Sequence, residues 1–226
     1  MLDIPFFSNT KDNLHCEQAC LKSLLKFYFP ERNYSFSFLD KNTFHKKGKW
    51  TWDTGGLILL AKLGIRSIYI SNFDYRSFFL KGEEYLRGIW SDEVYRAQRK
   101  YSDLKAEQKR AGVLINNNYI KLKKRAASIN DIRTLFKRGY ILMVQVNPFV
   151  LDGINKYGSH LVLVTDISER YVIFHDPGLP PHPNRKVPVS KFLESMEYPT
   201  KGSATIIATK RDTKATVNKN RVRRGY

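Results

Sequence analysis

Two cysteines, Cys16 and Cys20, lie four residues apart at the head of a segment with an apolar stripe. A thiol that attacks an amide carbonyl needs a base to take its proton and a group to orient that base. Cys16 lies where the predicted helix begins, and the free N–H groups and positive end of a helix lower the pKa of a thiol. Cys20 lies one turn further into the helix, where burial raises the pKa of its thiol. The position therefore favours Cys16 as a nucleophile.

The base would have to come from a distant part of the chain. His160 opens the apolar segment LVLVT, which is typical of a strand, and Asp176 ends the next predicted strand. If these strands pair as a hairpin, both residues lie at one end of the sheet, where the carboxylate can orient the imidazole. Alternatively both are turn residues, since Asp before Pro is common in turns. The chain offers five histidines in all: His15, His45, His160, His175 and His182.

The elements that must position these residues follow from hydrophobic periodicity and from helix stop signals. We predict a first helix over 16–29, which Pro30 ends, and a second that is capped by Asp53 or Thr54 and ends near Gly64. IRSIYIS then indicates a strand, and Ser91 is a plausible cap for a charged helix. Further on, SINDIRTLFKRGY predicts a helix with a capping box, followed by the strands YILMVQVN, SHLVLVTDI and RYVIFHD, a loop PGLPPHPNRK, a short helix at VSKFLESM and a last strand SATIIAT. Helices precede strands, which predicts an α+β class with a mainly antiparallel sheet.

Length and composition predict one domain over 1–208, with a charged helical insertion or lid at 76–124 and a basic, flexible tail over 209–226. No apolar run is long enough for a membrane span, and the amino terminus does not resemble a signal peptide. Two cysteines are too few for a disulfide framework, so we expect a cytoplasmic protein with reduced thiols. The net charge of +18 would suit an acidic partner or a nucleic acid, or a solvated basic surface.

The order of these motifs resembles the papain-like cysteine peptidases of the bacteriocin-processing (double-glycine leader peptidase) type. CEQACLKSLLKFY resembles their nucleophile helix, and INDIRTLFKRGYILMVQVN resembles their helix and strand before the histidine. GSHLVLVT and HDPG are similar to the segments with the base and the acid, and VPVSKFLE to the segment after them. The resemblance covers residues 1–70 and 128–208. It implies a papain-like fold and a peptide or protein substrate, without a metal or other cofactor.

The resemblance implies Cys16 as nucleophile, His160 as base and Asp176 as orienting acid. It places Asn9, in IPFFSN, where the family has an oxyanion-hole Gln; because Asn is shorter, Asn13 or Gln18 are alternatives. Glu17 stands where the family has Gly and would put a negative charge next to the thiolate.

Three rival interpretations remain open at this point. An acyl or peptidyl transferase would use the same thiol with an amine in place of water. A catalytically impaired fold would act as a basic binding module, through the insertion with KLKKR and the tail with RVRRGY. A metal site would use His15, Cys16 and Cys20, with His175 or His182 as a fourth ligand, although the spacing is not a common zinc pattern.

Overall fold

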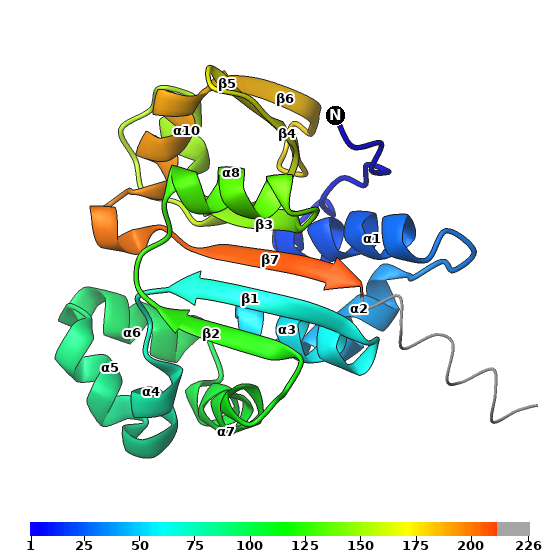
Figure 1. The fold of residues 1–226 in the computed structure, drawn as a ribbon. Helices are drawn as coiled ribbons and strands as arrows, with labels where there is room; N and C mark the ends of the chain where they lie inside the picture. Colours follow the sequence, from blue (N-terminus) through cyan, green and yellow to red (C-terminus); the bar gives the residue numbers. More distant parts are fainter. Residues whose placement is uncertain (212–226) are drawn as a thin grey trace, which may run out of the picture.

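The computed structural model describes residues 1–211, and it is built around one mixed sheet (Figure 1). The sheet has seven strands in the order β2-β1-β7-β3-β4-β5-β6. Every neighbouring pair is antiparallel except β1 with β2. The α+β class with a mainly antiparallel sheet is therefore confirmed. The strands are β1 (Ile65–Ser71), β2 (Ile120–Lys124), β3 (Ile141–Val146), β4 (His160–Ile167), β5 (Tyr171–Asp176), β6 (His182–Pro188) and β7 (Ile206–Arg211).

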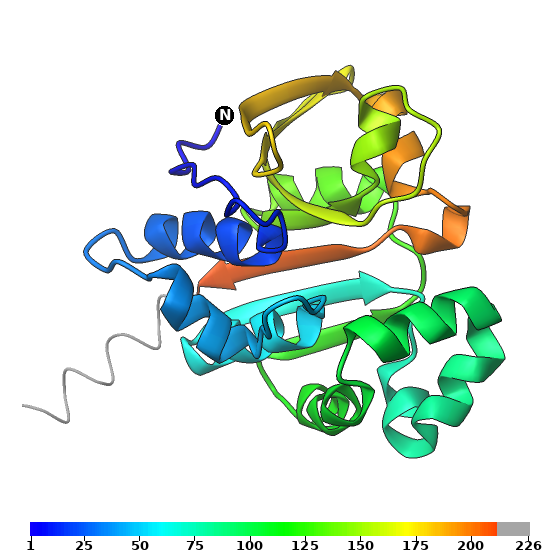
Figure 2. The same cartoon turned by 180° about the vertical axis from the view of Figure 1, so that it is seen from behind.

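Helices cover both faces of this sheet, as Figures 1 and 2 show from opposite sides. The face with α1, α2 and α3 also receives α7, and it encloses the first hydrophobic cluster. The second cluster lies on the other face, under α8 and α10. The helices are α1 (Cys16–Tyr28), α2 (Phe36–Thr43), α3 (Asp53–Lys62), α4 (Tyr75–Lys81), α5 (Glu83–Ile89), α6 (Asp92–Tyr101), α7 (Leu104–Ile115), α8 (Ile129–Lys137), α9 (Pro148–Leu151) and α10 (Val189–Met196), with a 3₁₀ turn at Lys201–Ser203.

Local sequence accounts for the elements next to the site. In β4, Leu161 and Leu163 pack in the first cluster and Val162 and Val164 in the second, as expected for a strand buried on both faces. The capping box predicted for α8 is present, with the Ser128 hydroxyl accepting from the Asp131 N–H and the Asp131 carboxylate accepting from the Ser128 N–H. Local sequence therefore accounts for helix α8, which precedes the candidate base, and for strand β4, which begins with it.

The first residues of the chain form an N-terminal strap across the sheet, which we define as residues 2–9. Its Leu2 N–H donates to the carbonyl oxygen of Thr165, and its Ile4 carbonyl oxygen accepts from His175 Nε2 at 2.7 Å. At its far end the Asn9 N–H donates to the carbonyl oxygen of Pro177 at 2.8 Å. The strap therefore leads directly from the β4–β5 hairpin to the start of α1.

Four expectations need correction. PGLPPHPNRK is not wholly a loop, because it contains most of β6, which pairs with β5 across a bulge between Phe174 and Asp176. The region 76–124 is not a lid outside the core, because its Phe78 and Leu86 are fully buried and its last residues form β2. β7 continues to Arg211, so the tail begins later than 209, and residues 212–226 lie outside the described part of the chain. The first residue of α3 is Asp53, but neither Asp53 nor Thr54 caps it; Trp52 is the N-cap residue.

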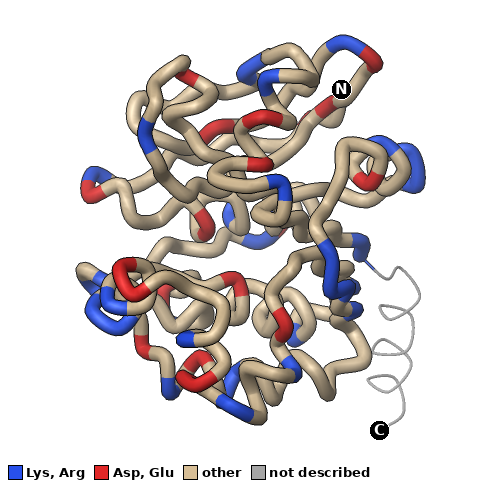
Figure 3. Tube along the Cα trace, turned by 90° about the vertical axis from the view of Figure 1, so that its left-hand side faces the viewer, with Lys and Arg blue, Asp and Glu red and all other residues tan. Residues whose placement is uncertain are grey.

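Positive charge in the described residues is interspersed with acidic residues rather than gathered into one block (Figure 3). Several cations of the middle region are paired. Lys124 lies 2.7 Å from Asp74, and Arg110 Nη2 lies 2.5 Å from Glu107. Among residues 1–211, no helix has the length and apolar character needed to cross a membrane.

Candidate active site

Cys16 and His160 come from elements that pack together. Cys16 is the first residue of α1 and His160 is the first residue of β4. Cys16 is half-buried, His160 is 8% exposed, and each side chain shifts the pKa of the other, so the two lie close together. As the first residue of the helix, Cys16 also has a backbone N–H without an intrahelical partner. A thiol and an imidazole from distant parts of the sequence are thus brought together by packing α1 on β4.

Asp176 holds the other side of the His160 ring. His160 Nε2 lies 2.8 Å from Asp176 Oδ1, and both side chains are buried. Since Asp176 occupies Nε2, the ring nitrogen Nδ1 is the one left for the Cys16 thiol. Both residues come from the antiparallel pair β4 and β5, as the hairpin argument required. The arrangement places a thiol, an imidazole and a carboxylate in series.

The electrostatics of this series favour charge separation between the thiol and the imidazole. Burial alone would raise the pKa of Cys16, but the hydrogen bond to His160 and the charge of its ring outweigh burial and lower it below the ordinary value. Burial likewise opposes a charged His160, yet the hydrogen bonds with Asp176 and Cys16 raise its pKa to about 10. Both directions favour a thiolate next to an imidazolium.

Asp176 stays ionised despite its burial. Desolvation would raise its pKa, but its hydrogen bond with His160, the charge of that ring, the Gly178 N–H and Arg185 lower it to about 2. Gly178 N donates to Oδ1 at 3.0 Å, and Arg185 Nη1 donates to Oδ2 at 3.0 Å. Both carboxylate oxygens therefore have donors. Arg185 was missed in the sequence because it lies in a segment interpreted as a loop.

Asn9 lies in the turn that leads into α1. Its Oδ1 accepts from the backbone N–H groups of Thr10 at 2.9 Å and His15 at 2.8 Å, and its Nδ2 donates to Asn13 Oδ1 at 2.9 Å. The His15 N–H is adjacent to Cys16, so Asn9 helps to fix the backbone before the thiol. One hydrogen of the Asn9 NH₂ remains beyond the bond to Asn13.

Gln18, the other alternative for the oxyanion, is committed elsewhere. It is fully buried, and its Nε2 donates to Thr43 Oγ1 at 2.9 Å and to Thr51 Oγ1 at 3.3 Å. Both hydrogens of its amide are therefore used to join α1 to α2 and to the segment before α3.

Glu17, next to the thiol, is buried and its carboxyl oxygens make no well-formed hydrogen bond, although the backbone of Gly56 lies close to Oε1. Burial, together with the nearby charges of Asp53, Cys16 and Glu107, raises the pKa of Glu17 well above its usual range. Its surroundings therefore favour the neutral acid over the carboxylate. The negative charge expected next to the thiolate is thus disfavoured by burial and by the neighbouring carboxyl groups.

The ligands proposed for a metal do not converge. Cys20 donates its Sγ–H to the Leu161 carbonyl oxygen, and both ring nitrogens of His175 are used, by Ile4 and by the Asn184 N–H. Within residues 1–211, no group of three or more His, Cys, Asp and Glu side chains could hold a metal ion.

Known proteins similar to this chain are found among solved structures. No family model matches the chain, and no curated protein matches it either. Among solved structures, the chain is similar to the peptidase domain of Streptococcus ComA, a bifunctional ABC transporter involved in quorum sensing. The two share 16% sequence identity with a TM-score of 0.48, and the match covers 90% of this chain and 96% of that one.

Proposed function

We propose that the chain is a papain-like cysteine peptidase, or an amidohydrolase of that type, which hydrolyses a peptide or amide bond through Cys16, His160 and Asp176. The observation that carries this proposal is the contact of His160 Nε2 with Asp176 Oδ1 at 2.8 Å, together with the effects that His160 and Cys16 have on each other's pKa. The side chains come from α1, β4 and β5, and they follow one another as thiol, imidazole and carboxylate, which is the order that thiol catalysis needs.

The reaction proceeds through a thioester. The Cys16 thiolate attacks the carbonyl carbon, and the resulting oxyanion accepts hydrogen bonds from the Cys16 N–H and the Asn9 amide. The His160 imidazolium gives its proton to the leaving amine as the C–N bond breaks. Neutral His160 then takes a proton from water, whose oxygen attacks the thioester and releases the acid and the thiolate. Asp176 holds His160 in the required tautomer throughout.

The acyl or peptidyl transferase alternative shares every step up to the thioester. An amine in place of water would then form a new amide. Product analysis with and without an added amine acceptor distinguishes the two, because only transfer joins the acyl fragment to the added amine.

The proposed hydrolysis is tested by incubating the full chain with a random peptide library and detecting new termini by mass spectrometry. We expect cleavage by the wild type, none by Cys16→Ala, and cleavage close to wild type by Cys20→Ala, the matched control in the same helix. Equal cleavage by wild type and Cys16→Ala would show that this thiol is not the nucleophile. No cleavage by any form would contradict hydrolysis of unmodified peptides.

The basic binding module is not favoured by a specific contact in the described residues. Lys124 and Arg125 of the KLKKR segment are paired with Asp74 and Asp131. RVRRGY lies outside the described residues. Interaction with an acidic partner or a nucleic acid stays a prediction, which a binding titration at low and high salt would test, because such binding weakens steeply as salt rises.

A further inference from the structure

Arg185 lies behind the acid of the candidate site. Its Nη1 donates to Asp176 Oδ2 at 3.0 Å, and its Nη2 donates to Asp152 Oδ1 at 2.6 Å. The Arg185 side chain is 17% exposed and that of Asp176 is 5% exposed. One planar guanidinium therefore joins two carboxylates in a fixed geometry, which a flexible ammonium cannot reproduce.

The sheet dictates where Arg185 points. In β6 it lies opposite Phe174 of β5, and Phe174 packs in the second hydrophobic cluster. Val187, two residues further along β6, packs in the same cluster, so Arg185 shares that face. The bulge between Phe174 and Asp176 shifts the register next to Arg185, and a bulge re-aims side chains at such a point.

We propose that Arg185 is a positioning residue of the site: it holds the Asp176 carboxylate against His160 and ties it to Asp152, at the end of α9. Asp176 Oδ1 already accepts from His160 and Gly178, and Arg185 is the donor to the buried Oδ2. Without the guanidinium, Oδ2 would be buried with no partner, which is costly for a carboxylate. Asp176 would then rotate or take up a proton, and His160 would lose its orientation.

The second arm of Arg185 reaches the segment that leads to His160. Asp152 ends α9, and residues 153–159 connect it to the first residue of β4. The same segment is held at another point, since Asn147 Nδ2 donates to the Lys156 carbonyl oxygen at 2.7 Å. Arg185 thus fixes the acid directly and the approach to the base through Asp152.

This inference rests on the proposed function, and it is tested on the thiol itself. The rate of Cys16 alkylation by iodoacetamide is measured from pH 5 to pH 10, with mass spectrometry distinguishing Cys16 from Cys20. For Arg185→Gln we expect about tenfold slower labelling at pH 6.5 and a midpoint that lies about one pH unit higher, the scale of one lost charge-assisted hydrogen bond. Arg185→Lys, which keeps one charged donor, should recover part of the loss, and Asp152→Asn should move the profile less than Arg185→Gln.

The matched control is Lys186→Gln, which removes one positive charge from the next residue of β6, where Lys186 is exposed and lies over the Tyr171 ring. It should leave the profile unchanged. A wild-type profile in Arg185→Gln and Arg185→Lys, with labelling that still depends on His160, would overturn the role of Arg185 while the proposed thiol site stands. Labelling of wild-type Cys16 that does not depend on His160 would overturn both. If Arg185→Gln does not fold, the alkylation profiles of Arg185→Lys and Asp152→Asn are used in its place. A raised midpoint in either variant supports the role of Arg185, and wild-type profiles in both contradict it.

Discussion

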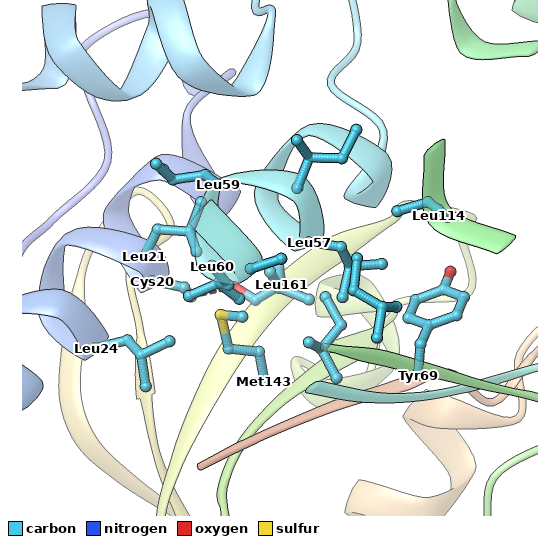
Figure 4. Close-up of a cluster of buried hydrophobic side chains, with 14 of the residues drawn as sticks. Cys20, Leu21, Leu24, Leu57, Leu59, Leu60, Tyr69, Leu114, Met143 and Leu161 are labelled. Atoms are coloured by element: carbon cyan, nitrogen blue, oxygen red, sulfur yellow. Dashed lines mark hydrogen bonds between the residues drawn. The ribbon is translucent and has the colours of Figure 1, made fainter. Parts of the chain in front are cut away.

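Cys20 Sγ lies 3.3 Å from the carbonyl oxygen of Leu161, the residue that follows His160 in β4. The second thiol of α1 therefore serves as a buried hydrogen-bond donor between the helix with Cys16 and the strand with His160. Figure 4 shows Cys20 next to Leu161, among leucines of α1 and α3. Burial, with the charges of Cys16 and Asp176, raises the pKa of Cys20 well above its usual range.

Cys20 should consequently resist alkylation under conditions that label Cys16. We expect iodoacetamide at pH 7 to modify Cys16 alone in the folded protein, and both thiols after denaturation, as mapped by mass spectrometry. Cys20→Ala should lower the free energy of unfolding by about 1 kcal/mol, since it removes a buried group with its hydrogen bond. Equal labelling of both thiols in the folded state would contradict the assignment.

The pH dependence of Cys16 reactivity follows from the opposing effects on its pKa. His160 lowers the pKa of the thiol and burial raises it. In His160→Ala burial is opposed only by the backbone N–H groups of Leu161 and Glu17, so the midpoint of alkylation should rise. We expect labelling at pH 7 to fall by at least about tenfold, because the thiolate fraction below the midpoint drops about tenfold for each pH unit that the midpoint rises. A midpoint that does not move would mean that His160 does not set the charge of Cys16.

Peptide hydrolysis should be lost at high pH, whereas alkylation of Cys16 should not. The leaving amine needs a proton from His160, whose pKa is raised to about 10. We therefore expect hydrolysis to fall as the pH passes about 10, where the imidazolium is lost, whereas alkylation of the thiolate continues. Parallel pH profiles of the two reactions check this point.

Glu17 should make the protein less stable as the pH rises. Its folded-state pKa is raised well above 4.5, so above pH 4.5 the unfolded chain loses a proton that the folded chain keeps. The free energy of unfolding then decreases by about 1.4 kcal/mol per pH unit until the folded-state pKa is reached. Glu17→Gln should match the wild type near pH 4 and become the more stable form above it, as measured by thermal unfolding at several pH values.

Substitution by alanine should change the stability of the protein in opposite directions at Gly55 and at Gly88. Alanine normally stabilises a helix relative to glycine by about 1 kcal/mol. A Cβ at Gly55 of α3 would lie 2.3 Å from the backbone oxygen of Thr43, whereas a Cβ at Gly88 of α5 would meet nothing within 4 Å. We expect Gly55→Ala to lower the melting temperature and Gly88→Ala to raise it slightly. A gain in both would mean that α2 moves away without cost.

One isosteric substitution separates the two roles of Asn9. Asn9→Asp keeps the oxygen that accepts from the His15 N–H and removes the NH₂ proposed for the oxyanion. Hydrolysis should fall by about a hundredfold, the usual effect of removing one such donor. Alkylation of Cys16, which forms no oxyanion, should change far less. Asn9→Ala, which also loses the acceptor, should reduce both, and equal losses of hydrolysis and alkylation in Asn9→Asp would argue against the oxyanion role.

The sequence predicted the parts of the fold that local periodicity determines. The helix from Cys16, its stop before Pro30, the Ser128 capping box and the paired strands from His160 and Asp176 are all confirmed. The strand β6 was missed because PHPNRK has no apolar alternation and contains Pro, which usually marks loops. Its stability comes from pairing with β5, which no local pattern records.

The environment of Glu17 was equally beyond sequence analysis. A glutamate after a cysteine indicates a negative charge, because glutamate is rarely buried without a partner. Its raised pKa depends on burial and on the neighbouring charges of Asp53 and Glu107, which come from α3 and α7. Only the packing of three helices brings these groups together.

The N-terminal strap gives the site a dependence that its three central residues do not reveal. The strap is hydrogen-bonded to the β4–β5 hairpin at Thr165 and His175, and to the loop after Asp176 at Pro177. Displacement of the first nine residues would therefore act both on the turn that precedes Cys16 and on the loop that follows Asp176.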